Sequence, residues 1–281
     1  MNISILFSPK PFRGDDAVNQ RRALESWRRE LPDAEIICYG EAEGVAEACR
    51  DFNVRLVAEI PFTETRAPRF DWIVAHAERE AKHDLQMFVN ADIILREGFA
   101  DAVAKIDLHE FLAVSDRMNF PDDAFNGGAG SDYFIFRRGM WKDLPPLAVG
   151  RAAYDNALMA YALRRRIPMI DATPAAYPMH PRHDYGHVAG GRATTYAGPD
   201  VAMNAKLYGN CEAPWLCDAD YVLFPDGLKP NRRFHGFPHR LLLRTQYRHT
   251  RNWPLRFLAR AIHFVFNRLG VARPRTWETE A

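Results

Sequence analysis

The chain has 281 residues, of which 47% are hydrophobic, so it is long enough for one large domain, or one domain with an appendage, around a sizeable core. Its net charge is +1, but residues 228–281 hold 12 Lys/Arg and 2 Asp/Glu, a local charge of +10 that leaves −9 on the preceding 227 residues. No apolar run of about 18 residues occurs and no basic segment followed by an apolar one opens the chain, so neither a transmembrane helix nor a secretory signal is expected. The four cysteines form no CxxC pair, which argues against a structural zinc site. We therefore expect a cytoplasmic protein, soluble or peripheral on the inner face of the membrane.

The first part of the chain predicts alternating strands and helices. Short apolar runs predict strands at 3–7, 35–40, 53–60, 88–95 and 110–115. Helices are predicted from Asp15 or Asp16 to about Leu31, and at 44–52, 71–82 and 96–106. This order is typical of a mostly parallel sheet with right-handed crossovers.

Two polar loops follow predicted strands. The segment 8–14 follows the first strand and carries two prolines and two cations, and the segment 61–70 carries two threonines and two arginines. Ligands of open α/β sheets bind beyond the carboxyl ends of the strands, so both loops are candidates for holding a nucleotide. The alternative for the first loop is an ordinary proline-rich connection.

The stretch 88–95 combines a buried-strand pattern with two polar residues, Asn90 and Asp92. A hydrophobic core has no use for this pair, whereas a carboxylate at a strand end suits a divalent cation that binds a diphosphate. The alternative is a solvated turn or cap.

Several short motifs follow one another in the order of a known family: Ser8-Pro9-Lys10-Pro11-Phe12, Asn19-Gln20, Ser26-Trp27, Tyr39-Gly40, Gly44-Val45 and Asn90-Ala91-Asp92-Ile93-Ile94. Over about residues 3–188 the chain resembles the GT-A-type nucleotide-diphospho-sugar transferases, although Asn90 is neutral where many relatives have a first Asp. The resemblance implies a GT-A-like (Rossmann-like) α/β fold, a Mn²⁺ or Mg²⁺ ion on Asp92, and a nucleoside diphosphate sugar in the first half of the chain. The residues expected to hold the nucleotide are Ser8, Lys10, Arg13, Thr65, Arg66, Arg69 and Asn90.

The second half supplies candidates for the sugar and the acceptor. The glycine-rich stretch 126–132 is neither a P-loop nor a dinucleotide fingerprint, since a strand at 133–136 follows it. In the family this segment lies beneath the donor sugar, so Asp132 is either a ligand of sugar hydroxyls or a turn residue. A helix is predicted to begin in the segment 147–156 and to run to about Arg165. Asp155 near its start either caps the helix or, as the resemblance implies, is the catalytic base, and Arg151 is a candidate substrate ligand.

The segment 179–187 holds three histidines, an Arg and an Asp. On a helix the histidines could form a zinc face, but Pro181 and Gly186 favour a loop. In the family a C-terminal His often completes the metal site, which makes His180 the first choice of ligand and His183 the second. The alternative is a surface cluster of histidines.

We divide the chain into a GT-A-like domain at 1–188, a loop-rich extension at 189–239 and a basic amphipathic tail at 240–281. The extension is either a cover for the acceptor site or a segment that only packs. In the tail, a helix from Pro254 to Gly270 is predicted to present an apolar stripe with arginines beside it. It either binds an anionic membrane surface or packs on the domain. Nucleic acid is not expected as a partner, because the rest of the chain is acidic.

These observations predict an inverting, metal-dependent glycosyltransferase that acts on a polysaccharide or lipid-linked acceptor. The alternatives are a non-catalytic sugar- or membrane-binding module with a degenerate site, and a sugar-phosphate nucleotidyltransferase. The latter would carry a glycine-rich, arginine-containing loop after the first strand, which residues 8–10 do not provide.

Overall fold

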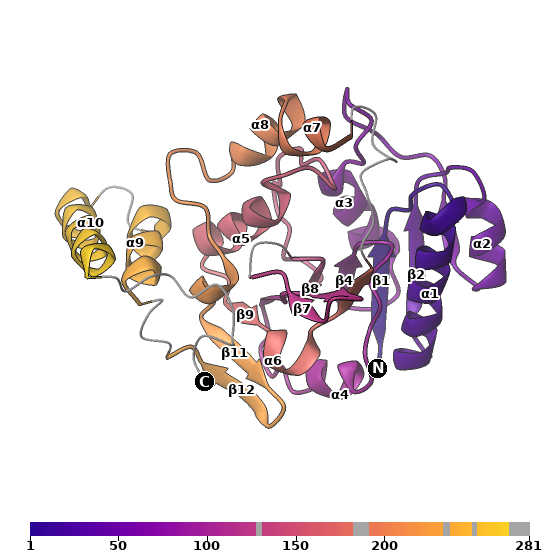
Figure 1. Ribbon diagram of the computed structural model, residues 1–281, viewed down its shortest axis with the longest axis horizontal. Helices are drawn as coiled ribbons and strands as arrows, with labels where there is room; N and C mark the ends of the chain where they lie inside the picture. The colour runs from indigo at the N-terminus through magenta and orange to yellow at the C-terminus, as the bar shows by residue number, and fades with distance from the viewer. Residues whose placement is uncertain (128–130, 182–190, 233–236, 249–251, 270–281) are drawn as a thin grey trace.

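The computed structural model describes residues 1–127, 131–181, 191–232, 237–248 and 252–269. They form a nine-stranded sheet with helices on both faces and a separate three-stranded sheet (Figure 1). The strands of the large sheet are β1 (Ile3–Phe7), β2 (Glu35–Tyr39), β3 (Arg55–Val57), β4 (Leu85–Val89), β5 (Leu112–Val114), β8 (Tyr133–Arg137), β9 (Met169–Asp171), β11 (Tyr221–Phe224) and β12 (Gly227–Pro230). The helices are α1 (Gly14–Glu30), α2 (Val45–Asp51), α3 (Phe70–Glu80), α4 (Phe99–Val103), α5 (Tyr154–Arg165), α6 (Thr173–Ala176), α7 (Gly191–Tyr196), α8 (Pro199–Ala205), α9 (Phe237–Arg248) and α10 (Trp253–Arg268), with a 3₁₀ turn η1 at Leu216–Asp218.

The large sheet has the order β12-β11-β9-β5-β8-β4-β1-β2-β3 and is mostly parallel. β8 runs antiparallel between β4 and β5, and β12 is antiparallel at one edge. The α/β fold with a mostly parallel sheet is thus as the sequence predicts. The reversed β8 matters for function, because its first residue, Tyr133, pairs with Val89 at the end of β4. Residues that precede β8 therefore lie beside residues that follow β4.

Successive side chains of a strand point to opposite faces of the sheet, so each central strand contributes apolar side chains to the core on both faces. In β1, Ile3, Ile5 and Phe7 belong to the cluster that packs on α1, α2, α4 and α6, whereas Leu6 belongs to the cluster that packs on α3, α5 and α9. A strand covered on both faces has no solvent side, which explains the continuous apolar runs in the sequence.

Helix α1 shows how the helices are tied to the sheet. Ala23, Leu24 and Trp27, which form an apolar stripe at helical spacing, are buried, and the Trp27 ring meets the Phe7 ring edge to face at 5.2 Å. The Trp27 indole N–H donates to the carbonyl of Ile93 at 2.8 Å, so the same side chain braces the segment after β4. The helix ends at Glu30, shortly before Pro32.

The structure refines two expectations about element boundaries. The helix expected to begin in the segment 147–156 begins at Tyr154 and ends at Arg165, as expected, and it does not begin earlier because Gly150 (φ 69°) and Ala153 (φ 66°) have left-handed conformations that a right-handed helix does not accommodate. The segment expected to be loop-rich contains α7, α8 and strand β11, and β11 pairs with β9 in the large sheet. The sheet therefore continues beyond residue 188, while the proposed functional division of the chain remains a prediction.

A small sheet lies beyond the ends of the central strands β4 and β5. It consists of β6 (Met118–Phe120), β7 (Ala124–Phe125) and β10 (Met179–Pro181), with β10 parallel to β6. Reciprocal backbone hydrogen bonds of 2.9 Å join Ile94 to Met179. They bring the residue that follows Met179, His180, next to the segment after β4.

Candidate active site

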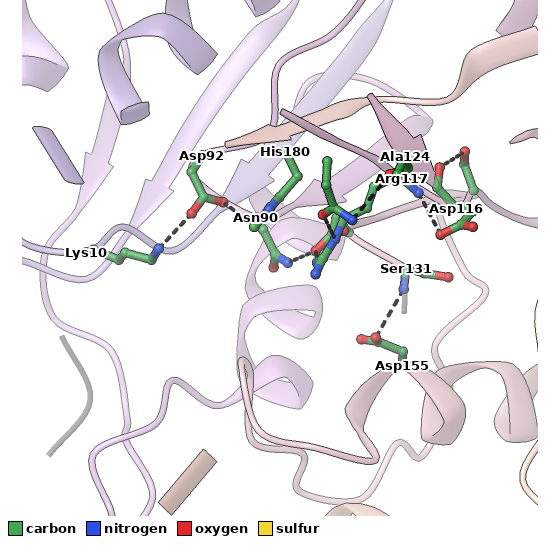
Figure 2. Close-up of polar contacts among 12 residues, drawn as sticks. Lys10, Asn90, Asp92, Asp116, Arg117, Ala124, Ser131, Asp155 and His180 are labelled. Carbon is green, nitrogen blue, oxygen red and sulfur yellow. Dashed lines mark hydrogen bonds and ion pairs between the residues drawn. The ribbon is translucent and has the colours of Figure 1, made fainter. Parts of the chain in front are cut away.

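The candidate site lies at one end of the central strands of the large sheet, where residues next to four of these strands meet. Lys10 follows β1, Asn90 and Asp92 follow β4, and Arg117 follows β5. Asp132 immediately precedes the reversed strand β8 and so reaches this end as well. Of the residues predicted for the site, the structure brings together Lys10, Asn90, Asp92, Asp132, Asp155 and His180. All of them except Asp132 are labelled in Figure 2.

Asp92 lies between a lysine and a histidine (Figure 2). Its Oδ2 accepts a hydrogen bond from Lys10 Nζ at 2.6 Å, and its Oδ1 is 3.9 Å from His180 Nε2. The side chains of Asp92, His180 and Lys10 are 4%, 11% and 15% exposed, so this ion pair is largely shielded from solvent. Lys10 is itself fixed by Gln20, whose amide bonds both its backbone N–H and its carbonyl.

Asp132 is held by an arginine that the sequence analysis did not single out. Arg117 Nη1 donates to both carboxylate oxygens of Asp132, at 2.9 and 2.8 Å, and Asn90 Nδ2 donates to Oδ1 at 2.8 Å. Burial lowers the pKa of Arg117, but the charge and hydrogen bond of Asp132 more than offset this, and the pKa is raised. Asn90 therefore bonds the Asp132 carboxylate, a task that needs a donor and that a carboxylate in its place could not perform.

Asp155 faces the same network from α5. Its Oδ2 accepts a hydrogen bond from the backbone N–H of Ser131 at 3.1 Å (Figure 2). The N-cap of α5 is Ala153 and has no side-chain capping bond, so Asp155 does not act as the helix cap. Burial raises the pKa of Asp155, the Asp132 charge raises it further, and the Ser131 N–H and Arg117 oppose them, which leaves the pKa at about 7. A partly buried carboxylate with this pKa is suited to accept a proton near neutral pH.

Two of the three ligands expected for the metal, Asp92 and His180, lie together in the described structure. Within the part of the chain that the structure describes, no three His, Cys, Asp or Glu side chains are grouped as ligands. Asp92 Oδ1 and His180 Nε2 nevertheless face each other across 3.9 Å, a spacing that one cation could bridge. Carboxylate and imidazole suit Mn²⁺, and Mg²⁺ needs only one or two carboxylates when substrate phosphates supply further ligands. The pair fits such an ion, and His183 lies outside the described residues.

The remaining residues expected to bind the nucleotide occupy several environments. Ser8 Oγ donates to the carbonyl of Tyr39 at 2.8 Å and so ties the loop after β1 to the end of β2. Arg69 is paired with Asp71 by two hydrogen bonds of 2.8 and 2.6 Å. Arg13 and Arg66 are exposed, and the Arg66 guanidinium lies 5.2 Å from the Phe62 ring centre. None of these side chains contacts Asp92 in the described structure, so their role in nucleotide binding remains a prediction.

Thr65 and Arg151 meet in a second buried cluster centred on Asp200 of α8. The Asp200 carboxylate accepts hydrogen bonds from Thr65 Oγ1 and, at 2.7 Å, from Thr63 Oγ1. Arg151 Nε lies 3.8 Å from the same carboxylate, and its Nη2 donates to the Thr65 carbonyl at 3.2 Å. The cluster fastens the loop 61–69 and Arg151, which precedes α5, to α8, and Thr63 is 137 positions from Asp200 in the sequence.

The residue that sequence reasoning missed is Arg117. One signal could have revealed it: Asp116 and Arg117 directly follow the predicted strand 110–115, and ligands of open α/β sheets bind beyond the carboxyl ends of strands. Ser131 was considered only as part of the glycine-rich stretch 126–132 and not as a feature of its own. Residues 128–130 of that stretch are outside the described structure.

Of the comparisons with known proteins, only the one with solved structures finds similar chains. Neither a protein-family model nor a curated protein sequence matches the chain. The chain is similar to TarS 1–349 of S. aureus in complex with UDP-GlcNAc, with 15% identity, coverage of 92% of this chain and 79% of that chain, and a TM-score of 0.51. It is also similar to the mannosyltransferase PcManGT of Pyrobaculum calidifontis in complex with GDP-Man and Mn²⁺, with 14% identity, coverage of 94% and 74%, and a TM-score of 0.51.

At this level of identity the similarity establishes the fold, and it extends over most of both chains. The resemblance expected from the sequence is therefore confirmed for the architecture. The chain has the GT-A fold of the nucleotide-diphospho-sugar transferases.

Proposed function

We propose that the protein is a glycosyltransferase that moves a sugar from a nucleoside diphosphate sugar to a hydroxyl of a polysaccharide or lipid-linked acceptor. The observation that carries the proposal is the convergence of Lys10, Asp92, Asp132, Asp155 and His180 at one edge of a GT-A sheet. In open α/β sheets this carboxyl edge is the place where ligands bind.

Asp155 is proposed as the general base. Its carboxylate would take the proton of the acceptor hydroxyl as that oxygen forms a bond to the anomeric carbon. The bond from the anomeric carbon to the diphosphate oxygen breaks at the same time, and its electron pair leaves with the nucleoside diphosphate. Attack from the side opposite the leaving group inverts the anomeric configuration.

Asp92 and His180 are the residues that would hold a Mn²⁺ or Mg²⁺ ion, with His183 as a further candidate. Such an ion supplies positive charge to the departing diphosphate. Lys10, whose ammonium already lies 2.6 Å from Asp92, places a protein cation beside the same position. Its pairing with Asp92 and with Gln20 keeps it oriented before the donor binds.

The alternative of a degenerate, non-catalytic site rests on the neutral Asn90 where many relatives have Asp. The bond from Asn90 to Asp132 gives a different reason for that residue, because a second carboxylate here would repel Asp132. A transferase is favoured over a binding module for this reason.

The proposal is tested with a panel of nucleotide sugars, added with and without Mn²⁺. A bound donor should raise the melting temperature, and slow release of free nucleoside diphosphate should accompany it. A binding module would show stabilisation without release, and a sugar-phosphate nucleotidyltransferase would instead need a sugar phosphate and a nucleoside triphosphate.

We further propose that α10 brings this site to an anionic membrane surface at the inner face of the membrane. No helix in the described part of the chain has the length and apolar character needed to span a bilayer. Helix α10 packs on α9, with Ala259 fully buried and the His263 ring 5.4 Å from that of His239. Its other side presents a row of exposed apolar side chains: Trp253, Phe257, Leu258, Phe264, Val265 and Leu269.

Exposed aromatic and aliphatic side chains beside arginines are typical of helices that lie on anionic membranes. Arg260 and Arg268 are exposed on the same helix.

The full-length protein should therefore bind liposomes that contain anionic lipid, more weakly as salt is raised, and should not bind neutral liposomes. The double substitution of Phe257 and Leu258 by Ser should abolish binding, whereas Phe120→Ser, which changes an exposed Phe on β6, should not. If the wild type ignores anionic liposomes at low salt, the membrane proposal is wrong.

A further inference from the structure

A chain of contacts links Arg117 to Asp155. Arg117 was not among the site residues expected from the sequence. Arg117 Nη1 donates to both oxygens of Asp132, and Arg117 Nε donates to Asn119 Oδ1 at 3.2 Å. The guanidinium is thus fixed on two edges, and its side chain is only 22% exposed. Because Nη1 reaches both oxygens of Asp132 while Nε is held by Asn119, the guanidinium has little freedom to rotate.

The next link is the backbone between Asp132 and Ser131. Asn90 holds Asp132 twice, through its side chain at 2.8 Å and through its backbone N–H, which donates to the Asp132 carbonyl at 2.9 Å. The neighbouring Ser131 N–H donates to Asp155 at 3.1 Å. Asp132 is thus held by its side chain and its carbonyl, and the residue directly before it supplies the N–H that bonds the Asp155 carboxylate.

Two charged side chains act on Asp155, and they act in opposite directions. The negative charge of Asp132 favours the protonated form of Asp155, and the positive charge of Arg117 favours the ionised form. The neighbouring Tyr154 is buried among Phe70, Phe88 and Phe134 and stays neutral, because burial and the Asp155 charge both raise its pKa.

We propose that Arg117 and Asp132 are positioning residues for Asp155, and that their ion pair sets the pH at which Asp155 becomes a base. This inference rests on the proposed role of Asp155 in sugar transfer. Asp132 raises the proton affinity of Asp155, Arg117 limits that rise, and the backbone N–H of Ser131, the neighbour of Asp132 in the chain, holds the base in place. The pair thus does more than bind a sugar hydroxyl, the role expected of Asp132 from sequence.

The prediction is a pair of opposite shifts. Without the Arg117 charge, Asp155 should titrate at a higher pH; without the Asp132 charge, it should titrate at a lower pH. Each shift should be at least about 0.5 pH unit, since the charge of a neighbouring group commonly moves a carboxyl pKa by about one unit. Both substitutions together should return the titration toward the wild-type value.

The test follows the Asp155 carboxyl carbon by NMR in protein labelled at aspartate, with Asp155→Asn identifying the signal. The variants are Arg117→Gln, Asp132→Asn and the double substitution, and the pH dependence of donor cleavage is recorded for each. Arg137→Gln, which breaks the surface pair of Arg137 with Asp84, is the matched control and should leave the titration unchanged. Arg117→Lys keeps the charge and should also leave it near the wild-type value, so Asp132→Asn and Arg117→Lys still test the proposal if Arg117→Gln does not fold.

Opposite NMR shifts, with the kinetic profile moving alongside them, would support the inference. Shifts in the same direction, or no shift in either variant, would overturn it even if the wild type cleaves its donor. Opposite NMR shifts in a protein that cleaves no donor would instead count against the proposed function, and would leave the electrostatic coupling supported.

Discussion

Replacing Asp200 by Ala should destabilise the folded protein by about 3 kcal/mol, a large effect for one residue. Asp200 lies on α8, is 5% exposed and accepts hydrogen bonds from Thr63 and Thr65, with the Arg151 guanidinium 3.8 Å away. The substitution removes the acceptor and leaves the three partner groups where they are.

The magnitude follows from what those groups lose. Thr63 and Thr65 are only partly buried and can turn to water, so each should cost no more than about 0.5 to 1 kcal/mol. The Arg151 side chain is 8% exposed and loses its counter-charge, which should cost about 2 kcal/mol. Asp200→Asn keeps the shape and one oxygen acceptor, so it should cost about half as much as Asp200→Ala.

The assay is urea unfolding at pH 7.5, followed by circular dichroism with equal slopes for all variants. The control is Asp84→Ala, because Asp84 is also paired with an arginine, Arg137 at 3.1 Å, but is 61% exposed. It should change the unfolding free energy by no more than about 0.5 kcal/mol. If Asp200→Ala costs no more than Asp84→Ala, the Asp200 cluster does not anchor the loop 61–69 and the account of that region is wrong.

Four further predictions concern the candidate site. Asp155→Asn should lower turnover by about 10²-fold or more with donor affinity near that of the wild type, and normal turnover in steady-state assays would contradict the role of base. Burial and Asp132 raise the pKa of Asp155 to about 7, so the native state binds the proton of this carboxyl more tightly than the unfolded chain does. The contribution of this proton to the free energy of unfolding is therefore fully present below about pH 4 and is lost as the pH rises through 7. Asp155→Asn should therefore gain stability relative to the wild type as the pH rises from 4 to 8 in urea unfolding, and a constant difference would show that Asp155 is not shifted. Asp92→Asn should abolish Mn²⁺-dependent donor binding in calorimetry and His180→Ala should weaken it less, whereas wild-type binding by Asp92→Asn would remove Asp92 from the metal site. Asn90→Asp should lower the melting temperature at pH 8 more than Asn90→Ala does, because the new carboxylate meets Asp132, and an equal or smaller loss would contradict the assigned bond.

Strands and helices with a strong local pattern could be predicted from the sequence. The run Ile3–Phe7 is apolar without a break and forms β1 as expected, because both faces of that strand are covered. The stripe of α1 was also readable, since its spacing alone identifies the buried side. The exact start of α5 within the segment 147–156 could not be predicted from composition, because it depends on the left-handed conformation of Ala153, a residue with no preference for it.

The candidate site was predictable only as far as its polar residues follow strands. Asp92 was found because it interrupts an apolar run, and Asp155 because the family resemblance placed a base near that helix. The pairing of Asp132 with Arg117 depends on the reversal of β8, which brings the start of one strand beside the end of another. The contact of Asp200 with Thr63 joins residues 137 positions apart, and no local pattern announces it.

Release of nucleoside diphosphate from a panel of nucleotide sugars, compared between the wild type and Asp155→Asn, tests the central claim most directly. The account predicts that at least one donor is cleaved by the wild type in the presence of Mn²⁺ or Mg²⁺, and that Asp155→Asn binds the same donor but cleaves it at least about 10²-fold more slowly. A wild-type protein that neither binds nor cleaves any nucleotide sugar, with or without the metal, would contradict the assignment of a glycosyltransferase site to this edge of the sheet.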